Sequence, residues 1–189
     1  MTSPRERMVA SAAVLIRERG AHPTAIADVL AHRGAPRGSA YHYFPGGRTQ
    51  LLCEAIDYAS DHIAARIDKT DSTATLLDAT IAGFRQQLTA SDFRAGCPIV
   101  AVAVEAGEPG SVESTPLDRA GVAFTRWTGQ ITRRLQTDGV SAERAEELAM
   151  LILTAIEGAV VVARATRDVT PLDLVHRQLR ALLPEGTSS

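Results

Sequence analysis

The sequence predicts an all-α protein. Apolar residues recur at three- and four-residue intervals through most of the 189-residue chain, whereas the alternation typical of half-buried strands is almost absent. Hydrophobic residues make up 45% of the chain, which is enough to form a proper core. Glycine or proline marks the ends of several periodic segments, as expected for helices joined by turns.

The first two helices are defined by their end residues. The first helix is expected from about Pro4 to Arg19, with Met8, Ala12, Leu15 and Ile16 along one face. It ends at Gly20, a residue type that is common at helix C-termini. A second helix is expected to begin at Thr24, a good N-cap, and to end at Gly34. A short turn therefore separates the two helices.

A third, very short helix is expected from Pro36 to about Tyr43, because proline suits the first helical turn. The turn at 45–47 precedes a fourth helix with apolar residues between 51 and 59. The remaining helices are expected near 75–91, 98–107, 116–137, 141–166 and 171–183.

Residues 24–43 have the spacing of a helix-turn-helix, in which the second helix enters the DNA major groove. An ordinary pair of short helices in a bundle fits the spacing equally well. Charge favours DNA. Residues 1–50 hold seven Arg and three acidic residues, whereas the remainder holds thirteen basic and nineteen acidic residues. Since phosphate contacts supply most of the affinity, the N-terminal segment is the candidate for binding a polyanion.

The stretch TAIADVLAHRGAPRGSAYHYFPGGRTQLL (24–52) resembles the DNA-binding signature of the TetR family of transcriptional regulators, and the similarity covers roughly residues 8–56. GCPIVAVAVEAGEP (96–109), the region around Trp127 and LTAIEGAVVVARATRDVTPL (153–172) resemble the LmrA/YxaF-like subgroup. The resemblance implies a helix-turn-helix domain of three helices at 1–48 and a larger helical domain at 49–189 for effector binding and dimerisation.

The DNA contacts follow from the resemblance residue by residue. The expected contact residues are Thr24, Arg33, Pro36, Arg37, Gly38, Ser39, Tyr41, His42 and Arg48. The residues from 36 to 39 would lie toward base edges, with Arg37 as the guanine contact. Tyr41 and His42 would face the DNA backbone, while the two rings that follow them would lock the short helix onto the first helix.

Two of these assignments rest on helix ends. Thr24 and Arg48, at helix N-termini, would hold phosphates, and Arg33 is either a contact or a solvated charge. The sequence departs from the family pattern at Pro36, where Ser or Thr is common, and at Ala40, where a larger apolar residue is common. The base preference is therefore left open.

The segment 141–166 is apolar nearly all round, which requires cover on every side. In a chain this small, a second subunit is expected on one side. Small residues recur every four positions at Ala155, Ala159 and Ala163 and permit close helix approach. The helix at 171–183 would add Leu172, Leu179, Leu182 and Leu183. The resemblance implies a four-helix bundle in a homodimer, and packing within one chain is the alternative.

The resemblance also implies a pocket for a small hydrophobic effector in the larger domain. Its candidate lining residues are Phe84, Cys97, Phe124, Trp127, Ile131, Met150, Leu153 and Glu157. Plain core is the alternative role for each of them. Trp127 and Glu157 are favoured, because an indole and a carboxylate in an apolar domain each need a polar partner. Glu105 is a further candidate.

Other classes of protein find little support. The chain has no glycine-rich phosphate loop, nucleophile elbow or metal-type spacing, so neither an enzyme nor a bound cofactor or metal is expected. The most membrane-like stretch, 148–165, is interrupted by Glu157. Two cysteines without a metal-type spacing, and no signal peptide, fit a reducing cytoplasm.

These observations predict a cytoplasmic, homodimeric TetR-type regulator that binds double-stranded operator DNA. A repressor released by a small hydrophobic effector is the first expectation, and an activator is the alternative. A helical interaction protein, or an enzyme without a recognisable motif and without specific DNA binding, is the competing class. Retention on specific DNA and its salt dependence distinguish the two.

Overall fold

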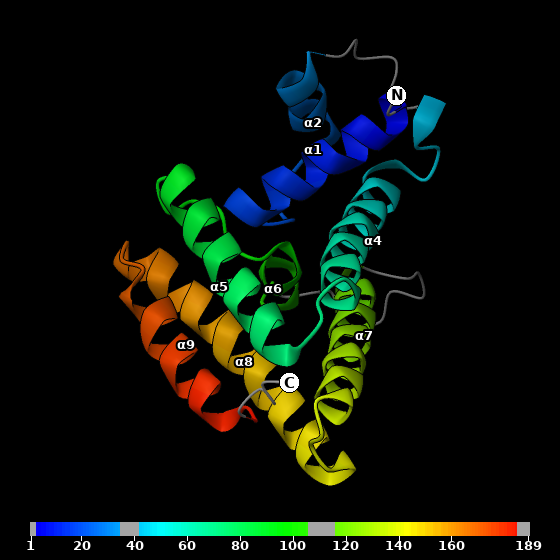
Figure 1. Ribbon diagram of the computed structural model, residues 1–189. Coiled ribbons are helices and arrows are strands. Elements are labelled where there is room, and N and C mark those ends of the chain that lie inside the picture. The colour runs from blue at the N-terminus through cyan, green and yellow to red at the C-terminus, as the bar shows by residue number, and fades with distance from the viewer. Residues whose placement is uncertain (1–2, 35–41, 106–115, 185–189) are drawn as a thin grey trace. The chain divides into compact units, whose positions relative to one another are not determined.

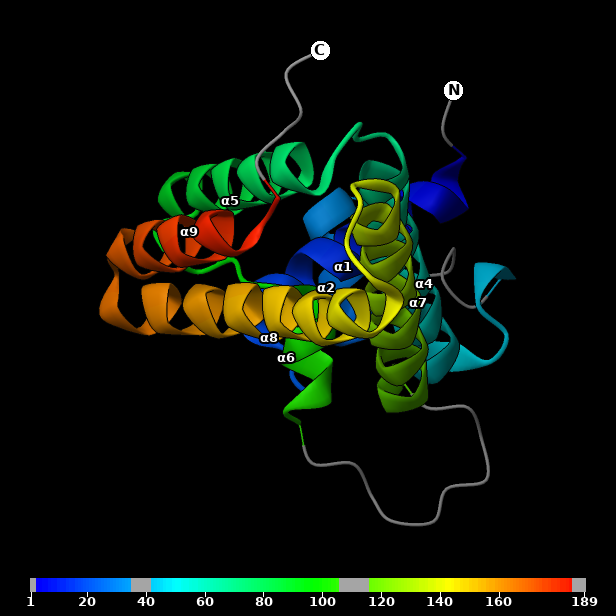
Figure 2. The same ribbon diagram turned by 60° about the horizontal axis from the view of Figure 1, so that its bottom comes forward.

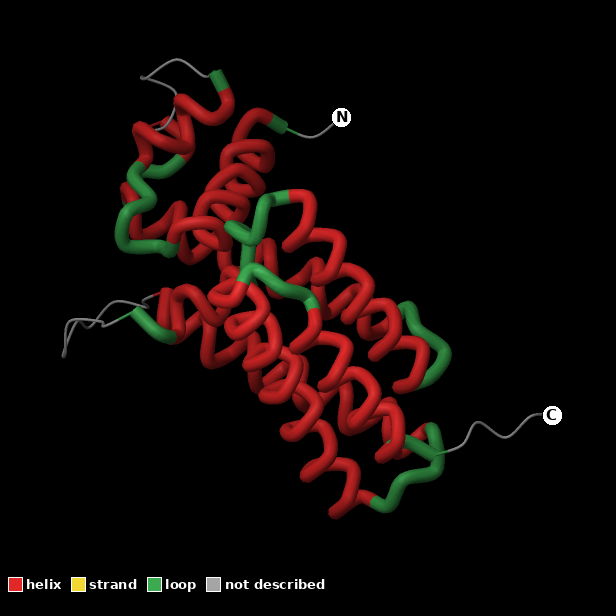
Figure 3. Tube along the Cα trace, turned by 90° about the vertical axis from the view of Figure 1, so that its left-hand side faces the viewer, coloured by secondary structure: helices red, strands yellow, loops and turns green. Residues whose placement is uncertain are grey.

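The computed structural model describes residues 3–34, 42–105 and 116–184 (Figure 1). These residues form helices and connecting loops without a strand (Figure 3), which confirms the predicted all-α class. The helices are α1 (Pro4–Arg19), α2 (Ile26–Arg33), α4 (Gly47–Asp68), α5 (Thr73–Ala90), α6 (Pro98–Ala103), α7 (Pro116–Thr137), α8 (Ala142–Thr166) and α9 (Thr170–Leu182).

The chain divides into two compact units. The N-terminal unit comprises Met1–His62 and Cys97–Ala123, and the C-terminal unit comprises Ile63–Gly96 and Phe124–Ser189. Helices α4 and α7 each contribute residues to both units. The domain boundary predicted at residue 48 does not coincide with these two units. It separates the predicted DNA-contact residues from the rest of the chain and stays a prediction.

Helix α1 has the bounds that the sequence predicts. Ser3 and Glu6 form a capping box at its start, in which the Ser3 hydroxyl accepts from the Glu6 N–H and the Glu6 carboxylate accepts from the Ser3 N–H. The helix ends at Gly20, whose φ of 94° suits a residue without a side chain. Its buried face packs against α2 and α6 within the N-terminal unit.

Helix α2 differs from its predicted start. Its N-cap is Ala25, whose N–H donates to the Asp28 carboxylate at 2.9 Å. The expectation that Thr24 caps this helix is wrong, because the buried Thr24 hydroxyl donates to the Gly20 carbonyl at 2.7 Å instead. The side chains of Ser, Thr and Asp can form hydrogen bonds with backbone groups before or after them in the chain. The sequence alone does not show which of these backbone groups is the partner.

In the C-terminal unit, α9 lies alongside α8 and α5 (Figure 2). Trp127 and Leu135 of α7, Leu148 of α8 and Leu172 of α9 are among its most deeply buried side chains. Gln130 is also buried there, and its amide donates to the Asp68 carboxylate at 2.8 Å. The core of this unit is therefore built by helices from the predicted larger domain.

Helix α8 is, among the described residues, the one helix long and apolar enough to cross a membrane by length and composition. A core helix of a soluble protein passes the same test. Only 39% of its most apolar window is buried within the chain, so this helix keeps a large exposed face.

The exposed face is not the one predicted from small-residue spacing. Ala159, Ala163, Leu172, Leu179 and Leu183 are all buried within the chain, in which α8 packs on α9. The prediction that these five form an intersubunit seam is wrong, whereas the predicted Ala155 is partly exposed and Leu182 is exposed. The exposed apolar side chains of α8 and α9 are instead Met150, Leu151, Val161, Val162, Leu174 and Leu182, which we call the apolar stripe.

Candidate nucleic-acid interface and ligand groove

The predicted DNA-contact residues fall partly outside the described chain. Pro36, Arg37, Gly38, Ser39 and Tyr41 lie outside it. Thr24, Arg33, His42 and Arg48 lie within the N-terminal unit. Arg33, in the last turn of α2, and His42 are both exposed. These two side chains are accessible to a polyanion.

The aromatic stretch after residue 41 is anchored on α1. Phe44 is 0% exposed, and the Arg5 guanidinium lies 5.2 Å from the centroid of its ring. Arg5 also donates to the Tyr43 carbonyl at 3.4 Å and to the Glu54 carboxylate at 2.5 Å. The His42 and Tyr43 rings meet edge to face at 5.3 Å. The predicted locking role therefore holds for the buried Phe44, while His42 stays outside.

Arg48 binds the loop between α1 and α2. Its guanidinium donates to the carbonyl oxygens of Ala21 (2.5 Å), His22 (2.9 Å) and Thr24 (2.9 Å). Arg48 thus holds the segment from which α2 starts. The Thr24 hydroxyl and two Arg48 nitrogens therefore form hydrogen bonds within the chain. The phosphate contacts of these two residues stay predictions.

The same loop is held from a second side. The His22 N–H donates to the Glu105 carboxylate at 2.8 Å, and a Cβ added to Gly20 would collide with that carboxylate. Glu105 follows α6, which packs against α1. Sequence reasoning considered Glu105 for the ligand pocket and missed this contact, because no local pattern relates positions 22 and 105.

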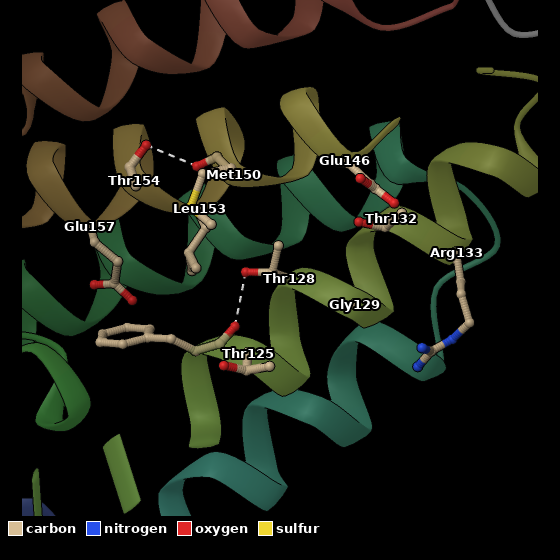
Figure 4. A pocket seen from close by; sticks show the side chains of 11 residues that line it. Thr125, Thr128, Gly129, Thr132, Arg133, Glu146, Met150, Leu153, Thr154 and Glu157 are labelled. Atoms are coloured by element: carbon tan, nitrogen blue, oxygen red, sulfur yellow. Dashed lines mark hydrogen bonds between the residues drawn. The ribbon is translucent and has the colours of Figure 1, made fainter. Parts of the chain in front are cut away.

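A groove of about 740 Å³ lies between α7 and α8 in the C-terminal unit (Figure 4), within the usual size range of small-molecule sites. Four predicted pocket residues, Phe124, Met150, Leu153 and Glu157, line it together. The remaining lining residues are Thr125, Thr128, Gly129, Thr132, Arg133, Glu146 and Thr154.

Sequence reasoning missed the polar half of this lining. The α7 members Thr125, Thr128, Gly129, Thr132 and Arg133 recur at three- and four-residue spacing. That spacing places them on one helical face, so the signal was present in the sequence. The same spacing is equally typical of an exposed polar helix face. These residues line a groove only because α8 lies opposite them.

Four predicted pocket residues do not line the groove. Trp127 is only 1% exposed, and its ring meets Phe124 edge to face at 5.8 Å, so it forms the core behind the groove. Ile131 is also buried, and Phe84 is partly buried on α5. Cys97 is buried in the other unit. Their predicted ligand contacts find no support in this groove.

Burial shifts the pKa of two acidic groups in the N-terminal unit. Burial raises the pKa of the Cys53 thiol, which disfavours the thiolate that nucleophilic or redox chemistry needs. Burial also raises the pKa of Asp57, although Arg119 at 3.1 Å opposes the shift. Among the described residues, His, Cys, Asp and Glu form no cluster that could hold a metal ion.

Comparison with known proteins gives a consistent picture. Residues 73–178 match the family model described as the C-terminal domain of LmrA/YxaF-like transcriptional regulators. An HTH-type transcriptional regulator of Mycobacterium tuberculosis H37Rv is 60% identical over 185 residues, which are 97% of this chain and 95% of that protein. The HTH-type transcriptional regulator LmrA of Bacillus subtilis is 28% identical, with 89% and 90% of the two chains covered.

Solved structures share the fold. The crystal structure of a TetR transcriptional regulator from Legionella pneumophila has a TM-score of 0.81 at 22% identity, and the match covers 97% of this chain and 99% of that one. A regulatory protein TetR from Rhodobacter sphaeroides has a TM-score of 0.79 at 19% identity, with 95% and 98% of the two chains covered.

Proposed function

Since the chain belongs to the LmrA/YxaF-like TetR-family regulators and is a DNA-binding transcriptional regulator, we propose that it acts as a homodimeric repressor that a small hydrophobic effector releases from its operator. The proposed site of action is the cytoplasm, where the operator DNA is found. The role requires no catalytic step.

The proposed DNA contacts are the nine residues named from the sequence. Residues 36–39 lie toward base edges, with Arg37 reading a base, whereas Thr24, Tyr41, His42 and Arg48 contact the DNA backbone. The exposure of Arg33 and His42 supports this assignment. Arg48 supports it in a different way, because its three bonds to the loop at 21–24 fix the start of α2. A base-reading helix needs such a fixed scaffold to discriminate between sequences.

The apolar stripe supports the homodimer. Leu151, Val161 and Val162 of α8 and Leu174 and Leu182 of α9 are each between 44% and 50% exposed, and the two helices pack on each other, whereas Met150 also lines the groove. Large apolar side chains left exposed on packed helices are typical of an interaction site. Gly158 lies among these residues, and a Cβ there would meet nothing within 4 Å, so a partner helix can approach closely. Two subunits would read two half-sites.

The groove between α7 and α8 is the observation that carries the proposed regulation. A protein that only bound DNA would need no cavity of about 740 Å³ in the unit that lacks the DNA-contact residues. For release to follow, the effector must bind the DNA-free conformation more tightly than the DNA-bound one, because equal affinities shift nothing.

Selection of binding sites from a random DNA library tests this function. We expect enrichment of a sequence with two related half-sites, bound by two subunits, with an affinity that falls steeply as salt rises. Retention on the selected site is then compared with retention on a scrambled site of equal length. A protein that retains both equally at every salt concentration is not the proposed operator-binding repressor.

A further inference from the structure

The groove between α7 and α8 combines an apolar wall with carboxylates. Phe124, Met150 and Leu153 supply the apolar surface, while Glu146 and Glu157 add two acidic groups. A purely hydrocarbon ligand would satisfy the apolar wall, but it would offer no hydrogen bond to these carboxylates, of which the Glu157 Oε2 is already buried. Enclosing an ionised group against an apolar molecule is strongly unfavourable. The polar groups of the wall therefore restrict the chemistry of the ligand.

Two hydroxyl groups of the wall present acceptor sites. The Thr128 hydroxyl donates to the Phe124 carbonyl at 2.9 Å, and the Thr154 hydroxyl donates to the Met150 carbonyl at 2.8 Å (Figure 4). Each hydroxyl has a single proton, so a bound molecule meets only lone pairs at these oxygens. Ionised carboxylates are also acceptors only.

The single basic residue among those that line the groove is Arg133, which lies at the end opposite Glu157 (Figure 4). Glu146 lies near the Arg133 end, and at 1.5 Å per residue it is roughly 16 Å from Glu157 along α8. Among the residues that line the groove, the Glu157 end therefore has a carboxylate and no basic side chain.

From this arrangement we infer that the groove takes a cationic amphiphile, with an N–H-donating head at Glu157 and an apolar body along Phe124, Met150 and Leu153. An ionised carboxylate offers about four acceptor sites, so bonds within the protein leave Glu157 capacity for a ligand. The role of this molecule as an effector rests on the proposed function, whereas the binding preference follows from the wall alone.

The test uses three matched probes, decylammonium, decanol and decanoate, each below its micelle concentration, with the full-length protein. Trp127 is the only tryptophan of the sequence and contacts Phe124, so its fluorescence reports binding in the groove. We expect decylammonium to bind at least about tenfold more tightly than decanoate, a difference of about 1.4 kcal/mol. Equal or tighter binding of decanoate overturns the inference.

Glu157→Gln keeps the size of the side chain and removes its charge. We expect it to weaken decylammonium binding about tenfold and to leave decanol binding within about twofold, because only the charge-assisted bond is lost. Glu147→Gln is the matched control, since Glu147 is exposed on the same helix, pairs with Arg144 and does not line the groove. An equal effect of both variants assigns the preference to overall charge and overturns the inference.

Two further readouts separate this inference from the proposed function. Sedimentation is measured with and without decylammonium, because a probe that dissociates the dimer at its binding concentration identifies the groove as a subunit contact and overturns the inference. Release of the selected operator is measured with the same probe. Glu157-dependent binding without DNA release upholds the ligand class and refutes effector control through this groove.

Discussion

The Arg48 Nε donates to the Thr24 carbonyl oxygen at 2.9 Å, across 24 positions of sequence. The same guanidinium also bonds the carbonyls of Ala21 and His22, so one side chain at the start of α4 holds the whole loop that precedes α2. Arg48, which the sequence predicts to contact a phosphate, thus forms hydrogen bonds within the protein. Its substitution has consequences for stability as well as for DNA binding.

Arg48→Met keeps an unbranched side chain and removes the donors. We expect it to lower the free energy of unfolding by about 1–3 kcal/mol, because several carbonyls lose a charged hydrogen-bond partner. Urea denaturation followed by circular dichroism measures this change. Binding to the selected operator and to scrambled DNA should fall by similar factors, since α2 loses its support rather than a base contact.

Arg33→Gln is the control for that experiment, because Arg33 is exposed at the end of α2. We expect its unfolding free energy to stay within about 0.5 kcal/mol of the original protein. If Arg33 contacts a phosphate, the logarithmic salt slope of DNA binding decreases by about 1. Equal destabilisation by the Arg33 and Arg48 variants would falsify the role given to the Arg48 bonds.

Arg37 carries the prediction about sequence discrimination. Arg37→Ala should weaken binding to the selected operator by about 1–3 kcal/mol more than binding to scrambled DNA, because a bidentate contact to guanine is lost. Fluorescence anisotropy titrations with both DNAs at one salt concentration measure the difference. Equal losses on the two DNAs would assign Arg37 to the phosphate backbone.

Val161 and Ala159 separate the dimer surface from the core of the C-terminal unit. Val161 is 50% exposed on the apolar stripe, whereas Ala159 is 4% exposed. We expect Val161→Glu to give folded monomers that lose specific DNA binding, because a charge enters the proposed subunit contact. Ala159→Glu should instead unfold the unit, because the charge enters the chain's own core.

Sedimentation velocity and far-ultraviolet circular dichroism are measured on both variants. A Val161→Glu protein that remains dimeric places the subunit contact on another surface. A well-folded Ala159→Glu protein would contradict the burial of that face of α8 against its own chain.

The sequence predicted the fold class and most helix bounds because their determinants are local. Helical periodicity, the capping residue Ser3 and the terminal Gly20 all act within one or two turns of chain. Helices α1 and α7 accordingly have the predicted bounds, 4–19 and 116–137. The other described helices deviate mainly at their ends, where propensity is weakest.

The errors concern partners rather than elements. The spacing of Ala159 and Ala163 predicts a subunit contact, but both residues are buried within their own chain, in which α8 packs on α9. The sequence predicts that Trp127 and Glu157 both contact the ligand. In the structure the Trp127 indole is buried behind the groove, whereas the Glu157 carboxylate lines it. Contacts between distant positions decide such cases, and a single sequence does not contain them.

Trp127 is therefore predicted to affect stability rather than ligand contact. Trp127→Ala should lower the unfolding free energy by about 3–5 kcal/mol, because it leaves a large cavity in the core of the C-terminal unit. Phe124→Ala should reduce probe binding with a smaller loss of stability, since Phe124 is only partly buried and lines the groove. Thermal unfolding and calorimetric titration with decylammonium compare the two variants.

Glu105 provides the last prediction. Its carboxylate accepts from the His22 N–H at 2.8 Å, on the same loop whose carbonyls Arg48 holds. A lost hydrogen bond of about 1 kcal/mol corresponds to about fivefold more opening. Glu105→Ala should therefore raise the exchange rate of the His22 amide about fivefold or more, and weaken operator binding because the start of α2 is less well fixed.

Glu105→Gln tests whether the bond itself is responsible, because the glutamine side chain keeps an acceptor oxygen at the same reach. We expect its His22 amide to exchange at nearly the original rate and its operator affinity to change little. Amide exchange by NMR and anisotropy titration measure both quantities. If the Gln and Ala variants lose amide protection equally, then the negative charge of Glu105, rather than its acceptor oxygen, fixes the loop, and a salt-dependent exchange rate would accompany that result.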